Sequence, residues 1–301
     1  MEPRTFDYLY YKTRGYANED IHQETGLSLE EIELLENAVQ PLLQEINEAK
    51  PKAKTIGQDF VRLTRYIYAD KSDQECGLPR PDAIKARSGE LFALPAVAKL
   101  DFGKISLQDA ITQRRSLRKY SEANLSLEEL SFLLYACSWA RDFRSNDRME
   151  ITFRNVPSAG SRHPIETFVN VHRVTGLKPG LYYYHPIKHC LILVDESPEI
   201  QNRIFEGCFR QEMVHSSAVN FIFTAVPYRT TWRYSQRGYR YLYLDAGHIG
   251  QNLHLAAEAI DGGACMIGAF LDEGMNDALK IDGIEEFVIY IAAVGKKPAA
   301  E

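Results

Sequence analysis

The sequence contains no apolar run of about 18 residues, the length that a membrane-spanning helix needs. Its five cysteines stand far apart, and no two of them form a CxxC pair. This odd, scattered set is typical of reduced, buried thiols, and it argues against a zinc site or a disulfide framework. The first twelve residues contain no apolar signal core, so we expect a cytoplasmic protein.

Three familiar motifs are also missing. There is no GxGxxG sequence for a dinucleotide-binding fold, no Walker A loop and no GxSxG nucleophile elbow. Net positive charge is missing as well, since 35 basic residues face 41 acidic ones and the formal net charge is −6. An acidic chain argues against nucleic acid or an anionic membrane as its main partner.

The N-terminal part is helical and acidic. Residues 15–36 have the pattern of a helix, a turn and a second helix, and Ser28 with Glu31 forms a capping box at the start of the second helix. This pattern resembles a DNA-binding helix-turn-helix. However, the stretch from Glu19 to Glu48 contains nine acidic residues and no lysine or arginine, and phosphate would repel such a helix. We therefore expect a packing arm.

The pattern of helices and strands predicts two parts. Residues 1–104 form the helical arm and an extended, proline-containing segment that wraps over a surface, and residues 105–301 form the main domain. In the main domain we expect strands at residues 168–174, 180–184, 189–194, 219–226, 264–270 and 287–294, helices at 106–120, 127–137, 200–215 and 238–260, and a charged loop at 141–150. Strands separated by long helices and a hairpin predict an α+β fold, with an antiparallel or mixed sheet flanked by helices.

Cations gather in the segment with the sequence RRSLRKY. It contains Arg114, Arg115, Ser116, Arg118 and Lys119. A guanidinium is a planar fork that binds phosphate oxygens two at a time. At the end of a helix, Arg114 and Arg118 would share a face and could clamp a small dianion. The alternative is a solvated basic face.

Two further stretches are candidates for a binding site. Residues 154–164, with the sequence RNVPSAGSRHP, form a tight loop whose backbone N–H groups are available to a ligand, or a plain turn. His185, His189 and Cys190 include metal-ligating types, but they lie around an expected hairpin turn, where polar residues are common. We expect no metal site.

Five blocks together resemble the nitroreductase-like flavoenzymes. They are RRSLRKY, VPSAGSRHPIETFVNV, GLYYYHP, GYRYLYLDAGHIGQNLHLAA and CMIGAF, in this order, within residues 105–297. Within that family the chain is most similar to the SagB-type dehydrogenase branch, which includes the azoline oxidases of peptide natural-product pathways. The resemblance implies an FMN-binding homodimer with two sites at the subunit interface.

The resemblance also assigns cofactor contacts. Arg114, Arg115 and Ser116 would hold the FMN phosphate and ribityl chain, Arg118 would lie near the pyrimidine edge of the ring, and Lys296 is a candidate second phosphate contact. A cation near the pyrimidine edge favours the reduced, anionic flavin.

Three other segments complete the implied contacts. Pro157, Ser158, Ala159 and Arg162 match the loop that reaches the flavin from the other subunit. Ile267, Gly268 and Ala269 match the segment whose backbone N–H approaches flavin N5, and Gln211 is a further candidate contact.

The catalytic pair of this branch is altered in the present sequence. Azoline oxidases carry a Lys-Tyr pair credited with proton removal, and the aligned residues are Arg233 and Tyr234. Arginine keeps its proton near neutral pH, so Arg233 is no general base. Its charge would still favour the ionised form of Tyr234. The alternative is that Tyr234 is a packing residue.

We predict an FMN-dependent oxidoreductase that passes hydride through flavin N5 in ping-pong order. Its specific function has a first candidate and two alternatives. The first is an FMN-dependent oxidoreductase of the SagB type, which oxidises a C–N or C–C bond of a small molecule or of a peptide azoline. The second is a nitro or quinone reductase that uses NAD(P)H. The third is a non-catalytic flavin- or peptide-binding partner of a peptide-modifying enzyme.

Overall fold

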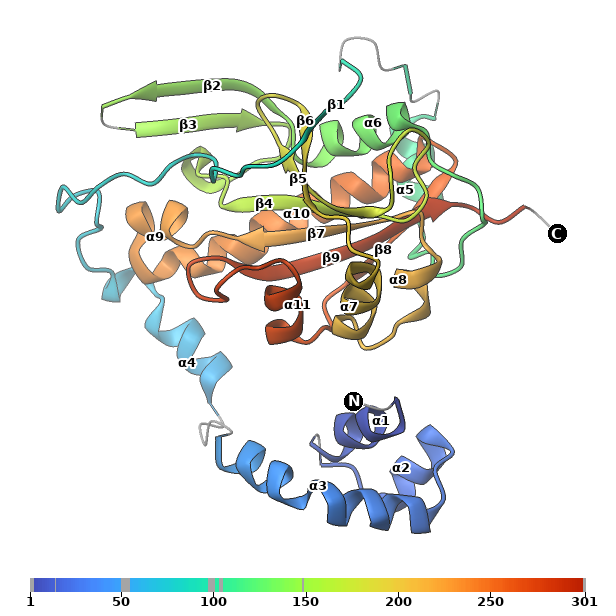
Figure 1. Cartoon of the computed structure of the whole chain (residues 1–301). Coiled ribbons are helices and arrows are strands. Elements are labelled where there is room, and N and C mark those ends of the chain that lie inside the picture. The colour runs from blue at the N-terminus through green and yellow to red at the C-terminus, as the bar shows by residue number, and fades with distance from the viewer. Residues whose placement is uncertain are drawn as a thin grey trace. The chain divides into compact units, whose positions relative to one another are not determined.

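The computed structural model describes residues 3–13, 15–49, 55–96, 101–102, 105–147 and 149–299. The chain divides into two compact units, residues 1–62 and residues 63–301 (Figure 1). Among the described residues, no helix has both the length and the apolar character that crossing a bilayer requires.

The first unit consists of helices. They are α1 (Pro3–Lys12), α2 (Asn18–Thr25), α3 (Leu29–Ala49) and most of α4 (Ile56–Leu63). The helix-turn-helix pattern and its capping box are confirmed, because the Ser28 N–H donates to Glu31 Oε2 over 2.9 Å and the Glu31 N–H donates to Ser28 Oγ over 3.2 Å. Buried Tyr8, Ile21 and Ile32 belong to a small core of the unit's own.

The second unit is built on a seven-stranded antiparallel sheet. Its strand order is β1-β6-β5-β4-β7-β9-β8, and a separate hairpin pairs β2 with β3. The strands are β1 (Leu91–Ala93), β2 (Ala140–Asn146), β3 (Met149–Arg154), β4 (Ile165–Val171), β5 (Gly180–His185), β6 (Cys190–Asp195), β7 (Val219–Ala225), β8 (Gly262–Ile267) and β9 (Phe287–Lys296).

Helices cover both faces of this sheet (Figure 1). The helices of this unit are α5 (Leu107–Gln113), α6 (Leu127–Cys137), α7 (Glu199–Gly207), α8 (Glu212–Ser216), α9 (Tyr228–Tyr234), α10 (Gly238–Glu258) and α11 (Asp272–Ala278), with short 3₁₀ turns at Tyr66–Tyr68, Ala159–Ser161 and Ser235–Arg237. Side chains alternate across the strands, so Val169 and Phe221 pack with α6 and α10, while Phe168 and Ile222 pack with α7 and α11. The predicted α+β fold with a helix-flanked antiparallel sheet is confirmed.

Three local predictions are wrong. The helix expected at residues 106–120 ends at Gln113, and the basic segment after it is extended. The charged loop expected at residues 141–150 is instead part of the β2–β3 hairpin. The helix expected at residues 200–215 is two helices, because Phe209 and Arg210 between them have φ values of 55° and 53°.

The segment before β1 is tied to α9. The Gln74 N–H donates to the Trp232 carbonyl over 2.8 Å, and the Trp232 indole N–H donates to the Leu78 carbonyl over 3.1 Å. Further along, Arg229 Nε donates to the Asp82 carbonyl over 2.7 Å. These bonds hold residues 74–82 against the helix that carries Arg233 and Tyr234.

Candidate functional site

The basic segment runs along the edge of β8. Ser116 pairs with Ala264 in a parallel bridge, and the Leu117 N–H donates to the Ala264 carbonyl over 3.0 Å. Alternation of side chains along an extended chain predicts that Arg114, Ser116 and Arg118 point to one side. Neither arginine forms an ion pair with a residue that the structure describes. The two cations expected to share a helix face therefore lie on an extended segment instead.

A glycine allows this close approach. A Cβ atom at Gly263 would lie 2.6 Å from a methyl carbon of Leu117. The absence of a side chain at Gly263 therefore lets Leu117, and with it the basic segment, pack directly against β8.

Two other predicted phosphate contacts have protein partners. The Arg115 guanidinium donates to the carbonyls of Thr112 and Arg114 over 2.9 and 2.8 Å, where it offsets the negative end of the α5 dipole. The Lys296 ammonium pairs with Glu129 and donates to the Ile260 carbonyl over 2.5 Å. In this structure the side chains of Arg115 and Lys296 therefore stabilise the protein next to the basic segment.

His254 adds a buried imidazole beside Arg114. Its side chain is 7% exposed, and Nδ1 has no hydrogen-bond partner among the described residues. Burial, and then the Arg114 charge, lower the pKa of His254, while Glu258 acts in the opposite direction. Sequence reasoning missed this residue, since a histidine on a long amphipathic helix is no signal by itself.

The far end of β8 meets Gln211. The Gln211 side-chain N–H₂ donates to the Ala269 carbonyl and to the Cys208 carbonyl, each over 2.9 Å. The structure thus brings Gln211 together with the predicted segment of Ile267, Gly268 and Ala269. Gly268 is exposed, and no atom lies within 4 Å of a Cβ placed there, so its backbone is open to a ligand.

Residues 157–163 form a strained loop between β3 and β4. Gly160, Ser161 and His163 have φ values of 58°, 52° and 44°, the left-handed region that non-glycine residues rarely adopt. The Ser158 hydroxyl oxygen accepts from the His163 N–H over 2.9 Å. Arg162 is buried and donates to the Glu150 carbonyl over 2.6 Å, so its guanidinium anchors the loop to β3.

The predicted Arg233–Tyr234 pair lies against this loop. A Cβ at Gly160 would lie 2.5 Å from the Tyr234 hydroxyl and 3.2 Å from a terminal nitrogen of Arg233. The Tyr234 ring packs edge-on against Tyr241, with centroids 5.0 Å apart. Two stretches that the sequence singled out separately therefore meet at one glycine.

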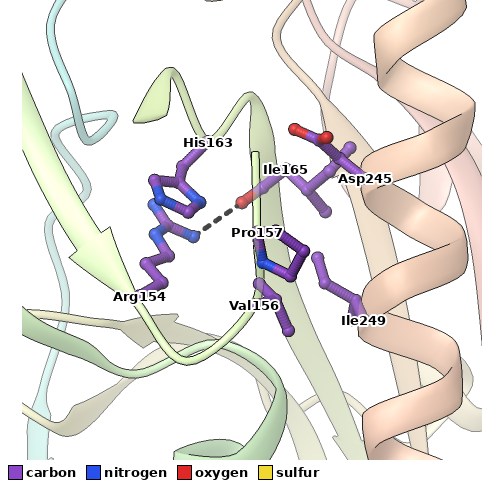
Figure 2. Close-up of a pocket in the computed structure, with 7 residues that line it drawn as sticks. All are labelled: Arg154, Val156, Pro157, His163, Ile165, Asp245 and Ile249. Carbon is purple, nitrogen blue, oxygen red and sulfur yellow. Dashed lines mark hydrogen bonds between the residues drawn. The ribbon is translucent and has the colours of Figure 1, made fainter. Parts of the chain in front are cut away.

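A buried carboxyl lies beneath the same loop. Asp245 on α10 is 4% exposed and lines a small cavity with Arg154, Pro157 and His163 (Figure 2). Burial raises the pKa of Asp245 to about 6, although the nearby Ser158 hydroxyl and Ala159 N–H act in the opposite direction. The only signal in the sequence is an acidic residue on an otherwise apolar helix face.

Buried charges support the start of β4. Glu166 forms an ion pair with Arg229, whose side chain is 3% exposed, and accepts from the Tyr183 hydroxyl over 2.5 Å. Burial, together with Arg154 and its neighbouring arginines, lowers the pKa of His163 to about 2, so this imidazole is neutral in the working range. The network fixes the point at which the loop rejoins the sheet.

Helix α10 connects the two groups of residues. Asp245 lies next to the loop and His254 lies next to Arg114 of the basic segment. The two residues are nine positions apart on the helix, which corresponds to about 14 Å. Among the described residues, no group of three or more His, Cys, Asp or Glu side chains is placed to hold a metal. His189 is bonded to Ser131 Oγ and to the Tyr184 hydroxyl, each over 2.7 Å.

The family model for nitroreductases matches residues 111–296, more than half of the chain. The chain belongs to the nitroreductase family. The match includes the basic segment from Arg114, the loop at residues 157–163, α10 and β8, so the matched region contains every candidate site residue. The family predicted from the five sequence blocks is confirmed, and the chain is an oxidoreductase of this family.

Relatives in this family include proteins of two kinds. The protein MJ1384 of Methanocaldococcus jannaschii, named as a nitroreductase, is 34% identical over 198 residues, which cover 65% of this chain and 94% of the relative. The trifolitoxin-processing protein TfxF of Rhizobium leguminosarum bv. trifolii is 32% identical over 214 residues, which cover 67% of this chain and 68% of TfxF.

Solved structures show the same fold. A nitroreductase-type protein of Anabaena variabilis superposes with a TM-score of 0.50 at 30% identity over 63% of this chain and 37% of its own. A chain of the Escherichia coli microcin synthetase McbBCD complex, solved with truncated pro-MccB17 bound, superposes with a TM-score of 0.53 at 18% identity over 85% of this chain and 97% of its own. At that identity the second likeness shows the nitroreductase fold alone.

Proposed function

We propose that this nitroreductase-family protein is an FMN-dependent oxidoreductase of the SagB type that acts on a peptide. The observation that supports it most directly is the side of the basic segment formed by Arg114, Ser116 and Arg118. It combines two cations that have no carboxylate partner among the described residues with a hydroxyl, along a strand that leads to the open backbone at Gly268.

The residues present fit the two ends of FMN. A phosphate with nearly two negative charges needs forked cations, which Arg114 and Arg118 supply. His254 offers a buried nitrogen without a partner on the same side. From Ala264 to Gly268 the chain advances about 13 Å, which suits a ligand with an anion at one end and a ring at the other.

A second copy of the chain completes the site in this proposal. Leu107 and Ile111 on α5 are 67% and 56% exposed, and Tyr243 and Leu244 on α10 are 59% and 57% exposed. Large apolar side chains on two packed helices are typical of a surface that another protein covers. We therefore propose a homodimer in which the loop at residues 157–162 reaches the flavin of the partner.

The peptide substrate is proposed from the relatives. One relative is named for trifolitoxin processing, and one similar structure is a microcin synthetase complex with truncated pro-MccB17 bound. FMN supplies an acceptor for two electrons and a proton as hydride. In the chain itself, Tyr234 takes up or releases the accompanying proton at its hydroxyl, and Arg233 supplies charge beside it without acting as a base.

The purified protein tests this function. We expect a yellow protein with a flavin spectrum, which an anaerobic thiazoline peptide bleaches and NADPH does not. Rapid bleaching by NADPH would instead support the nitro or quinone reductase that the name of MJ1384 suggests. Bound flavin that neither donor reduces would support the third function, a non-catalytic partner of a peptide-modifying enzyme.

Replacing Tyr234 with phenylalanine is expected to slow peptide oxidation by about 10²- to 10⁴-fold, the usual contribution of acid–base catalysis. FMN occupancy should not change, because the substitution removes only the hydroxyl group and keeps the ring. Stopped-flow bleaching of the flavin measures the step. Tyr241→Phe is the matched control, since its ring contacts Tyr234 but its hydroxyl bonds to Tyr66. Equal rates in Tyr234→Phe and the unmodified protein would remove Tyr234 from proton transfer.

A further inference from the structure

Asp245 contacts the loop from below. The carboxyl is almost fully buried, and the Ser158 hydroxyl and the Ala159 N–H lie close enough to it to lower its pKa. His248, one turn further along α10, lies 3.3 Å from the Pro157 carbonyl through Nδ1. Three consecutive loop residues are thus held by one face of the helix.

Asp245 lines a cavity of about 10 Å³. Figure 2 shows this space, with Arg154 and His163 on one side and Asp245 on the other. Asp245 Oδ2 and Arg154 Nη2 both lack a hydrogen-bond partner among the described residues. The cavity has room for about one water, so the side chain is held away from bulk solvent as long as the loop covers it.

We propose that Asp245 is a positioning residue that couples proton uptake to the closed conformation of the loop at residues 157–162. It acts on the flavin through Ser158 and Ala159, so this role rests on the proposed function of the loop. The coupling itself needs only the burial of the carboxyl and the cavity that Asp245 lines together with Pro157 and His163 of the loop.

The direction of the coupling follows from burial. With the loop closed, the pKa of Asp245 is about 6, whereas the ordinary value is 3.8. Opening the loop returns the carboxyl to water, where the charged form is better solvated. Protonation therefore favours the closed loop. As the pH rises from about 4 to about 6, the closed conformation loses up to about 100-fold in relative population, and it changes little above that range.

The neighbouring charged groups do not reverse this direction. Arg154 on β3 remains cationic and favours the charged carboxyl. His163 in the loop is neutral, because its pKa is lowered to about 2. Arg162 donates to the main-chain carbonyl of Glu150, and it is not among the groups that shift the pKa of Asp245. The remaining group is His248, an imidazole on the same helix, and it needs its own control.

Amide hydrogen exchange of the full chain between pH 4 and pH 7.5 tests the coupling. After correction for intrinsic exchange rates, protection of residues 158–163 should fall by up to about 100-fold as the pH rises. Asp245→Asn keeps the carbonyl and stays neutral, so its loop should remain protected throughout. His248→Gln should show the same fall as the unmodified chain, and residues 219–225 of β7 should not change in any variant.

Three results would overturn the proposal. They are a flat profile in the unmodified chain, an undiminished fall in Asp245→Asn, and a fall that disappears in His248→Gln. If Asp245→Asn does not fold, carboxyl NMR of the unmodified chain decides, since titration of Asp245 near 4 contradicts the coupling and titration near 6 supports it.

Binding of FMN separates this proposal from the proposed function. If the loop contacts the flavin, FMN affinity should fall with rising pH in the unmodified chain but not in Asp245→Asn. The loop's protection could depend on pH while FMN affinity does not. That result would establish the coupling and refute the contact between the loop and the flavin.

Discussion

The double replacement of Arg114 and Arg118 with alanine is expected to weaken FMN binding by about 10²- to 10⁴-fold. Each charge-assisted hydrogen bond to a phosphate contributes about 1.5–3 kcal/mol, so two lost guanidiniums remove about 3–6 kcal/mol. The fold should persist, because neither side chain forms an ion pair with a described residue and Arg118 is exposed. Flavin fluorescence titration of the flavin-free protein measures the affinity.

The same segment provides matched controls. Lys119 is exposed and lies on the opposite side of the extended chain, so Lys119→Ala removes one charge and should change the affinity less than threefold. Arg115→Ala should destabilise the end of α5, whose carbonyls it binds, more than it weakens FMN binding. Unchanged affinity in the double variant, or an equal loss in Lys119→Ala, would show that the phosphate binds elsewhere.

Replacing Glu166 with glutamine is expected to lower the free energy of unfolding by about 3–5 kcal/mol, the usual cost of removing one partner from a buried ion pair. The variant leaves the Arg229 guanidinium, 3% exposed, without its carboxylate, and Arg154 beside it is also buried. Urea unfolding of the full chain measures the change. Glu122→Gln is the control, because Glu122 is 87% exposed and its pair with Arg173 spans 3.7 Å.

The pH dependence of stability gives this prediction a second readout. The Arg229 and Arg154 charges hold the pKa of Glu166 below its ordinary value of 4.5, even though burial acts in the opposite direction. A lowered pKa means that the stabilisation is complete above about pH 4.5 and is lost as the pH falls further. The unmodified chain should therefore lose this stability in acid, and Glu166→Gln should not. Parallel acid profiles would contradict the role assigned to the ion pair.

Local sequence signals predicted much of the fold. The capping box at Ser28 starts a helix as expected, because it uses contacts within four residues. The β5–β6 hairpin and the apolar β7 also follow from short-range pattern. Such features need no information from distant parts of the chain.

The errors arise where distant contacts decide the conformation. The basic segment is extended because Leu117 packs on Gly263 and its N–H pairs with Ala264, almost 150 residues away in sequence. Strand β2 has an exposed, polar sequence, and the hairpin is held by contacts such as the Arg80–Glu150 ion pair. No local sequence pattern predicts either contact.

The candidate site was predicted in parts. The blocks identified the loop and the Arg233–Tyr234 pair, and the structure places them together at Gly160. Asp245 was overlooked because its importance depends on the loop that covers it, which is separated from it by more than 80 residues. The contacts of Arg115 and Lys296 with carbonyl oxygens could not be deduced from charge alone.

The left-handed backbone at Ser161 and His163 has a consequence for heat resistance. Each such residue costs about 1–2 kcal/mol, and the surrounding bonds must hold it in place. A segment with this backbone strain unfolds locally at a lower temperature than the sheet to which it is attached. Turnover is therefore expected to disappear on warming several degrees before the circular dichroism of the whole chain changes.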